Sequence, residues 1–141
     1  MALELSDDAR RLVALFEDEA DVVVRDCVLV DEYDLVVFVV KAGQMSDAIG
    51  PGGRTVKRIE RKLGKNVKLV EGADRPDAFV ANAFAPAAVY NVTISENDDT
   101  VAYVEVAEED RGVAIGTDGK NIDIVRTLAR RHFDVDGVEL T

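Results

Sequence analysis

Side chains suited to catalysis are scarce in this chain of 141 residues. It contains one cysteine, Cys27, one histidine, His132, and three serines, at positions 6, 46 and 95. A lone cysteine excludes an intrachain disulfide, and one cysteine with one histidine cannot complete a four-ligand zinc site of the usual kind. No nucleophile has an obvious base to activate it. We therefore expect a protein that is not an enzyme and that holds no metal or cofactor.

Long apolar runs and a basic leader are lacking as well. No apolar run approaches the roughly 18 residues that a membrane span needs. The opening MALELSDDAR is acidic where a secretory signal would be basic. Hydrophobic residues still make up 48% of the chain, which is typical of a folded protein. We expect a cytoplasmic protein, not bound to a membrane, with one medium domain or two minimal ones.

Positive charge is also in deficit. The chain has 17 basic and 28 acidic residues, and its net charge is −11. Proteins that bind nucleic acids are usually basic, so the total argues against such a function. The distribution argues for it, because the window 54–68 holds seven Lys or Arg residues and a single acid, Glu60. The clustering of the cations is therefore better evidence on nucleic-acid binding than the net charge.

The chain contains an internal repeat. The segment AIGPGGRTVKRIERKLGKNVKLV, residues 48–70, aligns without a gap on AIGTDGKNIDIVRTLARRHFDVD, residues 114–136. The glycines at 50 and 53 recur at 116 and 119, a spacing of 66 residues. The apolar residues around them recur in the same frame, so that Ala48, Ile49, Val56, Ile59, Leu63, Val67 and Leu69 fall on Ala114, Ile115, Ile122, Val125, Ala129, Phe133 and Val135. Two such matches indicate two copies of one fold.

The flanking patterns predict the same order of elements in both copies. Ser6 can cap a first helix, and the β-branched runs 22–30 and 35–40 read as a hairpin around a polar turn, 31–34. A short helix near 46–49, a helix over 54–63 and a strand over 67–70 complete the first unit. Pro76 and Pro86 bound the first helix of the second unit, and strands over 90–95 and 100–106 follow it. We expect an α+β protein with domains 1–72 and 73–141.

Each Gly-x-x-Gly segment joins two predicted helices. The first glycine can adopt a left-handed conformation that ends a helix, and the last precedes the free N–H groups of a new one. The positive end of that helix favours an anion, and a backbone without Cβ atoms can approach a phosphate closely. Such a segment can also be a plain helix-helix turn. Its recurrence, and the charge beside it, favour binding.

The helix after the first loop carries a one-sided basic face. At 100° per residue, five cations fall within about 100° of one another, opposite Val56, Ile59 and Leu63. These cations are Arg54, Lys57, Arg58, Arg61 and Lys65. A solvated helix face usually mixes charges of both signs, and this one does not. It lies beside the loop, where phosphate contacts would be needed.

The second copy is predicted to bind less strongly. Lys120 matches Arg54, but Lys57, Arg58 and Arg61 are replaced by Asp123, Ile124 and Thr127. Asp118 places a carboxylate inside the loop, where it should repel phosphate. Ile124 and Leu128 put apolar area on the formerly basic face, and we expect them to pack against the first unit.

Ile-Gly-x-x-Gly within this apolar frame resembles the KH domain, and the element order resembles its prokaryotic form, type II. Two such units in tandem resemble the archaeal NusA-like transcription factors over nearly the whole chain. The resemblance implies binding of single-stranded RNA during transcription termination, antitermination or elongation. Bacterial NusA carries a polymerase-binding domain and an oligonucleotide-binding barrel ahead of the tandem. This sequence contains neither, so RNA polymerase is left open as a partner, and we expect a monomer.

The predicted RNA-binding residues lie in and beside the two loops. Ile49 and Val56, with strand residues such as Val67, are expected to form the floor of a groove for unpaired bases. The predicted set in the first unit is Ile49, Gly50, Pro51, Gly52, Gly53, Arg54, Val56, Lys57, Arg58, Arg61 and Lys65. The predicted set in the second unit is Ile115, Gly116, Thr117, Asp118, Gly119, Lys120 and Ile122.

The excess of acid resembles the composition of proteins from salt-loving archaea. At molar salt the Debye length is only about 3 Å, so an acidic surface would barely repel RNA at a distance. The same salt weakens binding that is driven by counterion release. Affinity would then depend on backbone N–H groups at the loops and on base contacts.

Of three other readings, the first is excluded by its spacing and two remain open. GVAIGTDGKN superficially suggests a nucleotide P-loop, but six residues separate Gly112 from Gly119 where that loop has four, and Asn121 follows Lys120. The apolar segment 78–85 could dock on polymerase or on a ribosomal partner, although a place in a core between the two domains is favoured. KH domains of this type also occur in ribosomal proteins and in ribosome-assembly GTPases, which leaves a role in translation open.

Overall fold

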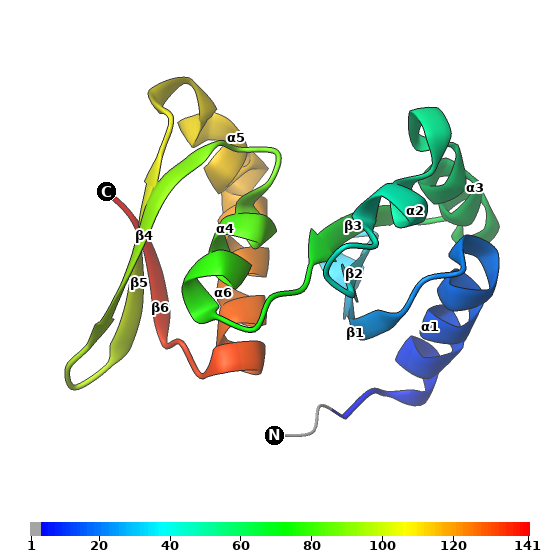
Figure 1. Ribbon diagram of the computed structural model, residues 1–141, viewed down its shortest axis with the longest axis horizontal. Helices are drawn as coiled ribbons and strands as arrows, with labels where there is room; N and C mark the ends of the chain where they lie inside the picture. Colours follow the sequence, from blue (N-terminus) through cyan, green and yellow to red (C-terminus); the bar gives the residue numbers. More distant parts are fainter. Residues whose placement is uncertain (1–3) are drawn as a thin grey trace. The chain divides into compact units, whose positions relative to one another are not determined.

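The chain forms two compact units that divide after Gly72. The computed structural model describes residues 4–141, and each unit is described by itself. Both units are α+β, with one three-stranded sheet and three α-helices apiece in the described residues (Figure 1). The predicted fold class is confirmed.

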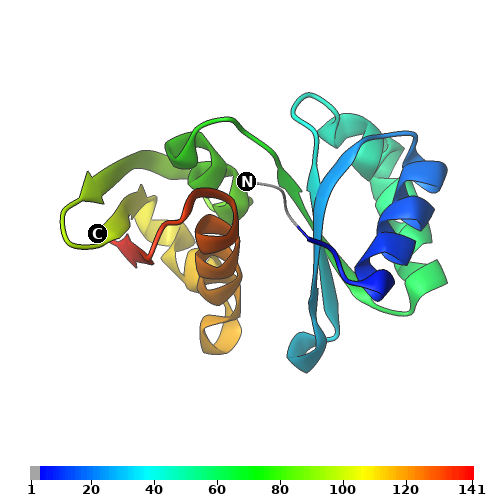
Figure 2. The ribbon, with the colours of Figure 1, turned by 90° about the horizontal axis from the view of Figure 1, so that it is seen from below.

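The first unit has the predicted helix-strand-strand-helix-helix-strand order. Its elements are α1 (Asp7–Ala20), β1 (Val24–Val30), β2 (Leu35–Val40), α2 (Met45–Ile49), α3 (Arg54–Leu63) and β3 (Asn66–Glu71). The hairpin strands β1 and β2 pair antiparallel, whereas β2 and β3 pair parallel because the chain crosses back through α2 and α3. Figure 2 shows the helices of this unit on one face of its sheet.

Local signals in the sequence fix the ends of these helices. The Ser6 hydroxyl accepts a hydrogen bond from the Ala9 N–H at 3.1 Å and so caps α1. Gly64 ends α3 in the left-handed conformation, with φ of 67°. Between helices and sheet lies a core that includes Phe16, Phe38 and Ile59, all fully buried. The rings of Phe16 and Phe38 lie 4.6 Å apart.

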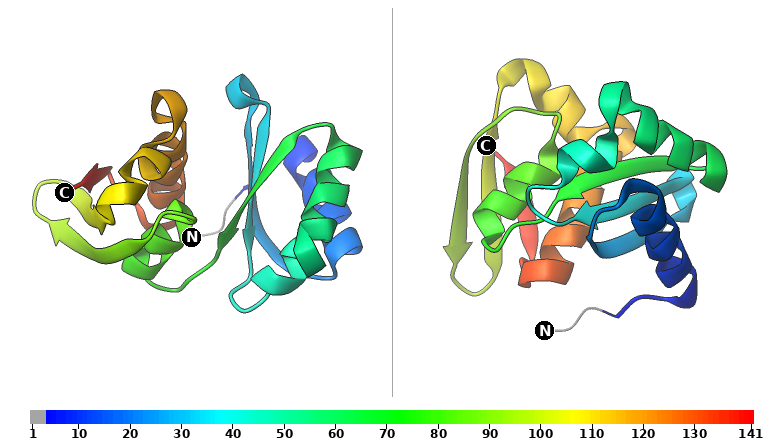
Figure 3. Two further views of the ribbon diagram at one scale, coloured as in Figure 1. Left: turned by 90° about the horizontal axis from the view of Figure 1, so that it is seen from above. Right: turned by 45° about the vertical axis from the view of Figure 1, so that its right-hand side comes forward.

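The second unit repeats the topology. Its elements are α4 (Pro76–Phe84), β4 (Val89–Glu96), β5 (Thr100–Val106), α5 (Arg111–Ile115), α6 (Lys120–Phe133) and β6 (Gly137–Leu140). Again the hairpin is antiparallel and the third strand joins parallel to the second. The first strand of each unit has an irregularity in its pairing near its start. The register shifts between Val24 and Asp26 in β1, and between Val89 and Asn91 in β4. The views in Figure 3 show the helices of each unit on one side of its own sheet.

The gapless alignment of the two copies fails at the end of the second helix. α3 has 10 residues and α6 has 14, so α6 is longer by about one turn. Phe133, predicted to match the strand residue Val67, instead closes α6, and its ring packs 5.4 Å from that of Phe79. His132 also lies in the last turn of α6, with its ring centroid 4.8 Å from that of Phe79. The longer helix thus extends the packing against α4.

The apolar helix α4 takes part in this packing. Phe79, Val80, Ala83 and Phe84 are all buried. Because Phe79 lies against two aromatic rings of α6, the helix contributes to the core of the second unit. The predicted place of segment 78–85 between the two domains stays a prediction.

Candidate nucleic-acid interface

The two Gly-x-x-Gly loops have nearly the same backbone. Gly50 has φ and ψ of 77° and 168°, and Gly116 has 79° and 167°. Gly53 has φ and ψ of 77° and 13°, and Gly119 has φ and ψ of 76° and 12°. Each loop forms a tight three-residue turn between a five-residue helix and a longer one. The repeat therefore extends to the dihedral angles of the loop.

The first glycine of each loop lies too close to the following helix for any side chain. A Cβ atom on Gly50 would lie 2.9 Å from the Thr55 backbone nitrogen, and one on Gly116 would lie 2.7 Å from that of Asn121. Real Cβ atoms essentially never come so close. The loop is thus folded tightly onto the first turn of the helix that it introduces.

The third position of the loop is open instead. Gly52 has φ of 61°, and a Cβ atom there would meet nothing within 4 Å. Asp118 has the corresponding conformation in the second unit, with φ of 56°, and its side chain is exposed. Aspartate is among the few residues that adopt this region readily. The second loop therefore presents a carboxylate where the first presents bare backbone.

Both loops end at a helix N-terminus without a side-chain cap. Gly53 precedes α3 and Gly119 precedes α6, and neither residue has a side chain that could accept from the first turn. The positive end of each helix dipole therefore faces the loop and favours an anion. Beside the first loop, Arg54 Nε donates to the Pro51 carbonyl at 3.2 Å, which holds this cation over the turn.

The basic face of α3 is divided. Arg58 Nε lies 3.0 Å from Glu19 Oε2, and its Nη2 donates to the Glu19 carbonyl at 3.3 Å. Lys62 binds the other oxygen of the same carboxylate. These hydrogen bonds, from Lys62 and then Arg58, lower the pKa of the Glu19 carboxyl. Both cations tie α3 to the end of α1, so Arg58 is less available for RNA than the sequence suggested.

The other half of the face is open. Within residues 4–141, neither Lys57 nor Arg61 makes a hydrogen bond or an ion pair, and both are exposed. Lys65 Nζ lies 3.2 Å from Asp34 Oδ1. Of the five cations predicted for this face, two are free within residues 4–141, two are bound to carboxylates, and Arg54 bonds to the loop.

The apolar positions also differ between the units. Ile49 and Ile115, each 38% exposed, end the short helices ahead of their loops. Val56 is half-buried, whereas its counterpart Ile122 is buried and offers little surface to a base. The sequence reading missed Val113, which is 49% exposed beside the second loop. In the alignment of the two repeats, Val113 takes the position of the charged residue Asp47. An apolar residue at a position that is charged in the other copy could have indicated its exposure.

The basic face is not repeated on α6. Asp123 pairs with Arg126 at 3.4 Å, and Thr127 donates its hydroxyl to the Asp123 carbonyl. Ile124 and Leu128 are buried. Their packing against the first unit stays a prediction.

Family models match each unit. A model described as "NusA-like second KH domain" matches residues 76–140, and one described as "KH domain" matches residues 11–74. A relative from Halobacterium salinarum is 57% identical over 141 residues, which is 100% of both chains. It is named "Probable transcription termination protein NusA". The chain belongs to the archaeal NusA-like family with two tandem KH domains.

Other NusA-like proteins give the same assignment. A relative from Halococcus morrhuae with the same name is 57% identical and covers 99% of either chain. One from Methanocaldococcus jannaschii is 35% identical over 129 residues, 91% of this chain and 69% of its own. The solved structure described as "Crystal structure of APE1850" has a TM-score of 0.84 at 28% identity, covering 97% of this chain and 100% of that one. The predicted family is confirmed, and the halobacterial relatives fit the acidic composition. In the part of the chain that the structure describes, no helix is long and apolar enough to cross a membrane.

The close approach at Gly50 is testable by comparison with another glycine of positive φ. Gly43 has φ of 88° and open space where its Cβ atom would lie. Gly43→Ala should therefore cost only the left-handed conformation, about 1–2 kcal/mol. Gly50→Ala would place alanine at φ of 77° and ψ of 168°, a region essentially limited to glycine, and would add a clash with the backbone of α3, so it should cost clearly more. Thermal unfolding in concentrated KCl measures both, and equal losses would contradict the steric account.

Proposed function

We propose that this NusA-like protein binds single-stranded RNA, chiefly through its first KH loop, and acts on transcripts during termination, antitermination or elongation. The observation that carries the proposal is the loop itself. Glycine backbone is folded against an uncapped helix N-terminus in both units, and free cations follow it in the first. The names of the relatives support the process, and the KH domains support the ligand.

The loop can hold a phosphate by short-range contacts. The helix N-terminus offers backbone N–H donors and a positive dipole end, and the glycines let the sugar-phosphate chain come close. Ile49 and Val56 offer apolar surface nearby, on which an unpaired base can lie. Arg54 adds a cation above the turn. Nothing in this scheme requires a reaction or a cofactor, so the proposed role is binding.

The two loops should contribute unequally. Gly52→Asp would give the first loop the carboxylate that Asp118 gives the second, in a conformation that aspartate adopts there. We expect it to weaken RNA binding roughly tenfold, because a like charge would face the phosphate. Gly52→Asn is the matched neutral control and should bind nearly as well as the parent protein. Thr117→Asp, in the loop that is already acidic, should have little effect. Fluorescence titration at fixed salt measures all three, and equal losses for Gly52→Asp and Thr117→Asp would remove the proposed difference.

The salt dependence of binding should be shallow. Single-stranded ligands lose about 0.7 in the log-log slope per neutralised phosphate, so seven contacts would give about 5. Arg58, Lys62 and Lys65 are already held by carboxylates and should not replace counterions on the RNA. The expected slope is therefore well below 5 in a KCl titration. A slope near 5, the value for seven neutralised phosphates, would contradict this proposal.

Crosslinking in cells at native salt, followed by sequencing of the bound fragments, tests the process. We expect reads near the 3′ ends of transcripts, and co-purification would show whether RNA polymerase is a partner. Reads confined to ribosomal RNA would favour a role in translation and would overturn the proposal for transcription.

A further inference from the structure

Gly112 is a glycine that the fold does not require. It lies in the short helix α5, its φ is not positive, and a Cβ atom on it would meet nothing within 4 Å. All ten glycines of the chain lie within residues 4–141, and no other one combines these two properties. Glycine inside a helix is destabilising relative to alanine. The fold therefore gains nothing from the missing side chain, whereas a ligand that approaches the backbone closely would need it.

The surface on both sides of Gly112 is apolar. At 100° per residue, Gly112 lies opposite the buried Ala114, and Val113 and Ile115 lie on the two flanks of α5. Val113 is 49% exposed and Ile115 is 38% exposed. The outer side of this helix is thus bare backbone between two aliphatic side chains.

Two unpaired carboxylates lie at one end of this apolar surface. Glu108 and Glu109 belong to the turn that runs directly into α5, and both are exposed. Within residues 4–141, neither carboxylate makes a hydrogen bond or an ion pair. Arg111, the only cation of α5, donates from Nη1 to the Thr141 carbonyl at 2.8 Å and is therefore engaged elsewhere. The α5 surface, as we name it, consists of Glu108, Glu109, Gly112, Val113 and Ile115.

The first unit has a different surface on the same backbone. The spacing of 66 residues places Ser46 at the position of Gly112 and a charged residue at that of Val113. Ala42 and Gly43 stand at the positions of the two glutamates. Because α2 and α5 have the same length and lead into loops of nearly the same dihedral angles, the backbone does not impose the α5 surface.

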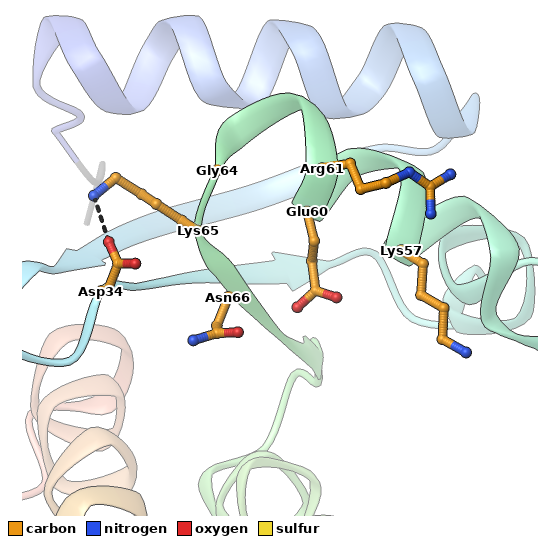
Figure 4. A pocket seen from close by; sticks show the side chains of 7 residues that line it. All are labelled: Asp34, Lys57, Glu60, Arg61, Gly64, Lys65 and Asn66. Atoms are coloured by element: carbon orange, nitrogen blue, oxygen red, sulfur yellow. Dashed lines mark hydrogen bonds and ion pairs between the residues drawn. The ribbon is translucent and has the colours of Figure 1, made fainter.

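Its charge makes the α5 surface a poor site for RNA. The first unit offers a phosphate the free cations Lys57 and Arg61, whose side chains extend from α3 in Figure 4. A phosphate near α5 would instead meet two glutamates and, in the loop that follows, the exposed Asp118. Charge complementarity therefore favours a ligand of α5 that is cationic and partly apolar.

We propose that the α5 surface binds a segment of a protein partner in which a basic side chain stands next to an aliphatic one. The bare backbone at Gly112 lets the segment come close, and its aliphatic side chain packs on Val113 or Ile115. Its basic side chain pairs with Glu108 or Glu109. At molar salt, charges act over only about 3 Å, so these pairs contribute at direct contact, whereas apolar packing is not screened. The inference goes beyond RNA binding and does not depend on it.

A short peptide in which arginine and leucine alternate is the probe for this surface. In NMR titrations of the isotope-labelled full chain in concentrated KCl, we expect it to shift the amide signals of residues 107–116. Matched peptides with glutamate in place of arginine, or with serine in place of leucine, should bind clearly less. If no peptide shifts these signals, or if all shift them equally, the inference is overturned.

Gly112→Gln separates binding from folding. Glutamine is a better helix former than glycine and has open space here, so the variant should unfold at the temperature of the parent protein or higher. The added side chain occupies the place of the partner segment, and the arginine-leucine peptide should bind about tenfold more weakly. Ser46→Gln places glutamine at the same exposed position of α2 and should leave peptide binding unchanged. Equal losses in the two variants would overturn the inference.

Glu109→Gln tests the charged part of the α5 surface. It removes one carboxylate and should weaken the arginine-leucine peptide about twofold to threefold. Glu96→Gln removes another exposed carboxylate, at the end of β4, and should have no effect. Equal effects would show a general attraction of the peptide to an acidic chain and would contradict specific binding at α5.

The same variants distinguish a protein ligand from RNA. Gly112→Gln and Glu109→Gln should leave the binding of a short oligouridylate unchanged, whereas Gly52→Asp should weaken it. If Gly112→Gln weakens the oligouridylate and not the peptide, α5 belongs to the RNA site, and the inference fails while the proposed function stands. If the peptide binds as expected and the parent protein binds no RNA at any salt concentration, the inference stands and the proposed function fails.

Discussion

The candidate interface depends on the contact between each loop and the first turn of the helix that follows. Gly50 lies so close to Thr55, and Gly116 to Asn121, that any Cβ atom would overlap the helix backbone. This contact lets a five-residue helix, a three-residue turn and a longer helix follow one another without a linker. The N-terminus of the longer helix therefore lies directly at the loop, uncapped by side chains. Both the position of the anion-favouring dipole and the place where the cations begin follow from this steric arrangement.

The two units have the same loop backbone but different side chains on it and on the helix that follows. Their loops agree within a few degrees at the glycines, yet the third position is bare in one and a carboxylate in the other. Cations on α3 correspond to Asp123, Ile124 and Thr127 on α6. Since the close approach involves only the backbone, it constrains none of these outward side chains. The same loop geometry is therefore compatible with fewer cations and a longer helix in the second unit.

Much of the fold could be predicted from the sequence because its signals are local. The apolar run at 35–40 is β2, and the frame around the first loop places α3 at 54–63. The end of α6 could not be predicted in this way. α3 ends at Gly64, a typical left-handed cap, but α6 ends at Asp134, which gives no comparable signal. The division of the basic face was also hidden, because the partner of Arg58 is Glu19, 39 residues earlier. A helical wheel places Arg58 and Arg61 together, and only tertiary contacts separate them.

The acidic composition explains why the cations of α3 divide into ones that are bound to carboxylates and ones that are free. In a chain with 28 acidic residues, a cation meets a carboxylate easily, and Glu19 and Asp34 together hold three of the cations on and after α3. A cation that is held this way stabilises the fold but offers little to a phosphate. Within residues 4–141, Lys57 and Arg61 make no ion pair, and Glu60, the one acid of their own helix, accepts a hydrogen bond from the Val67 N–H of β3. At molar salt, where charges act over only about 3 Å, the free cations beside a ligand matter far more than the total charge. An acidic protein can therefore present a local binding site for RNA.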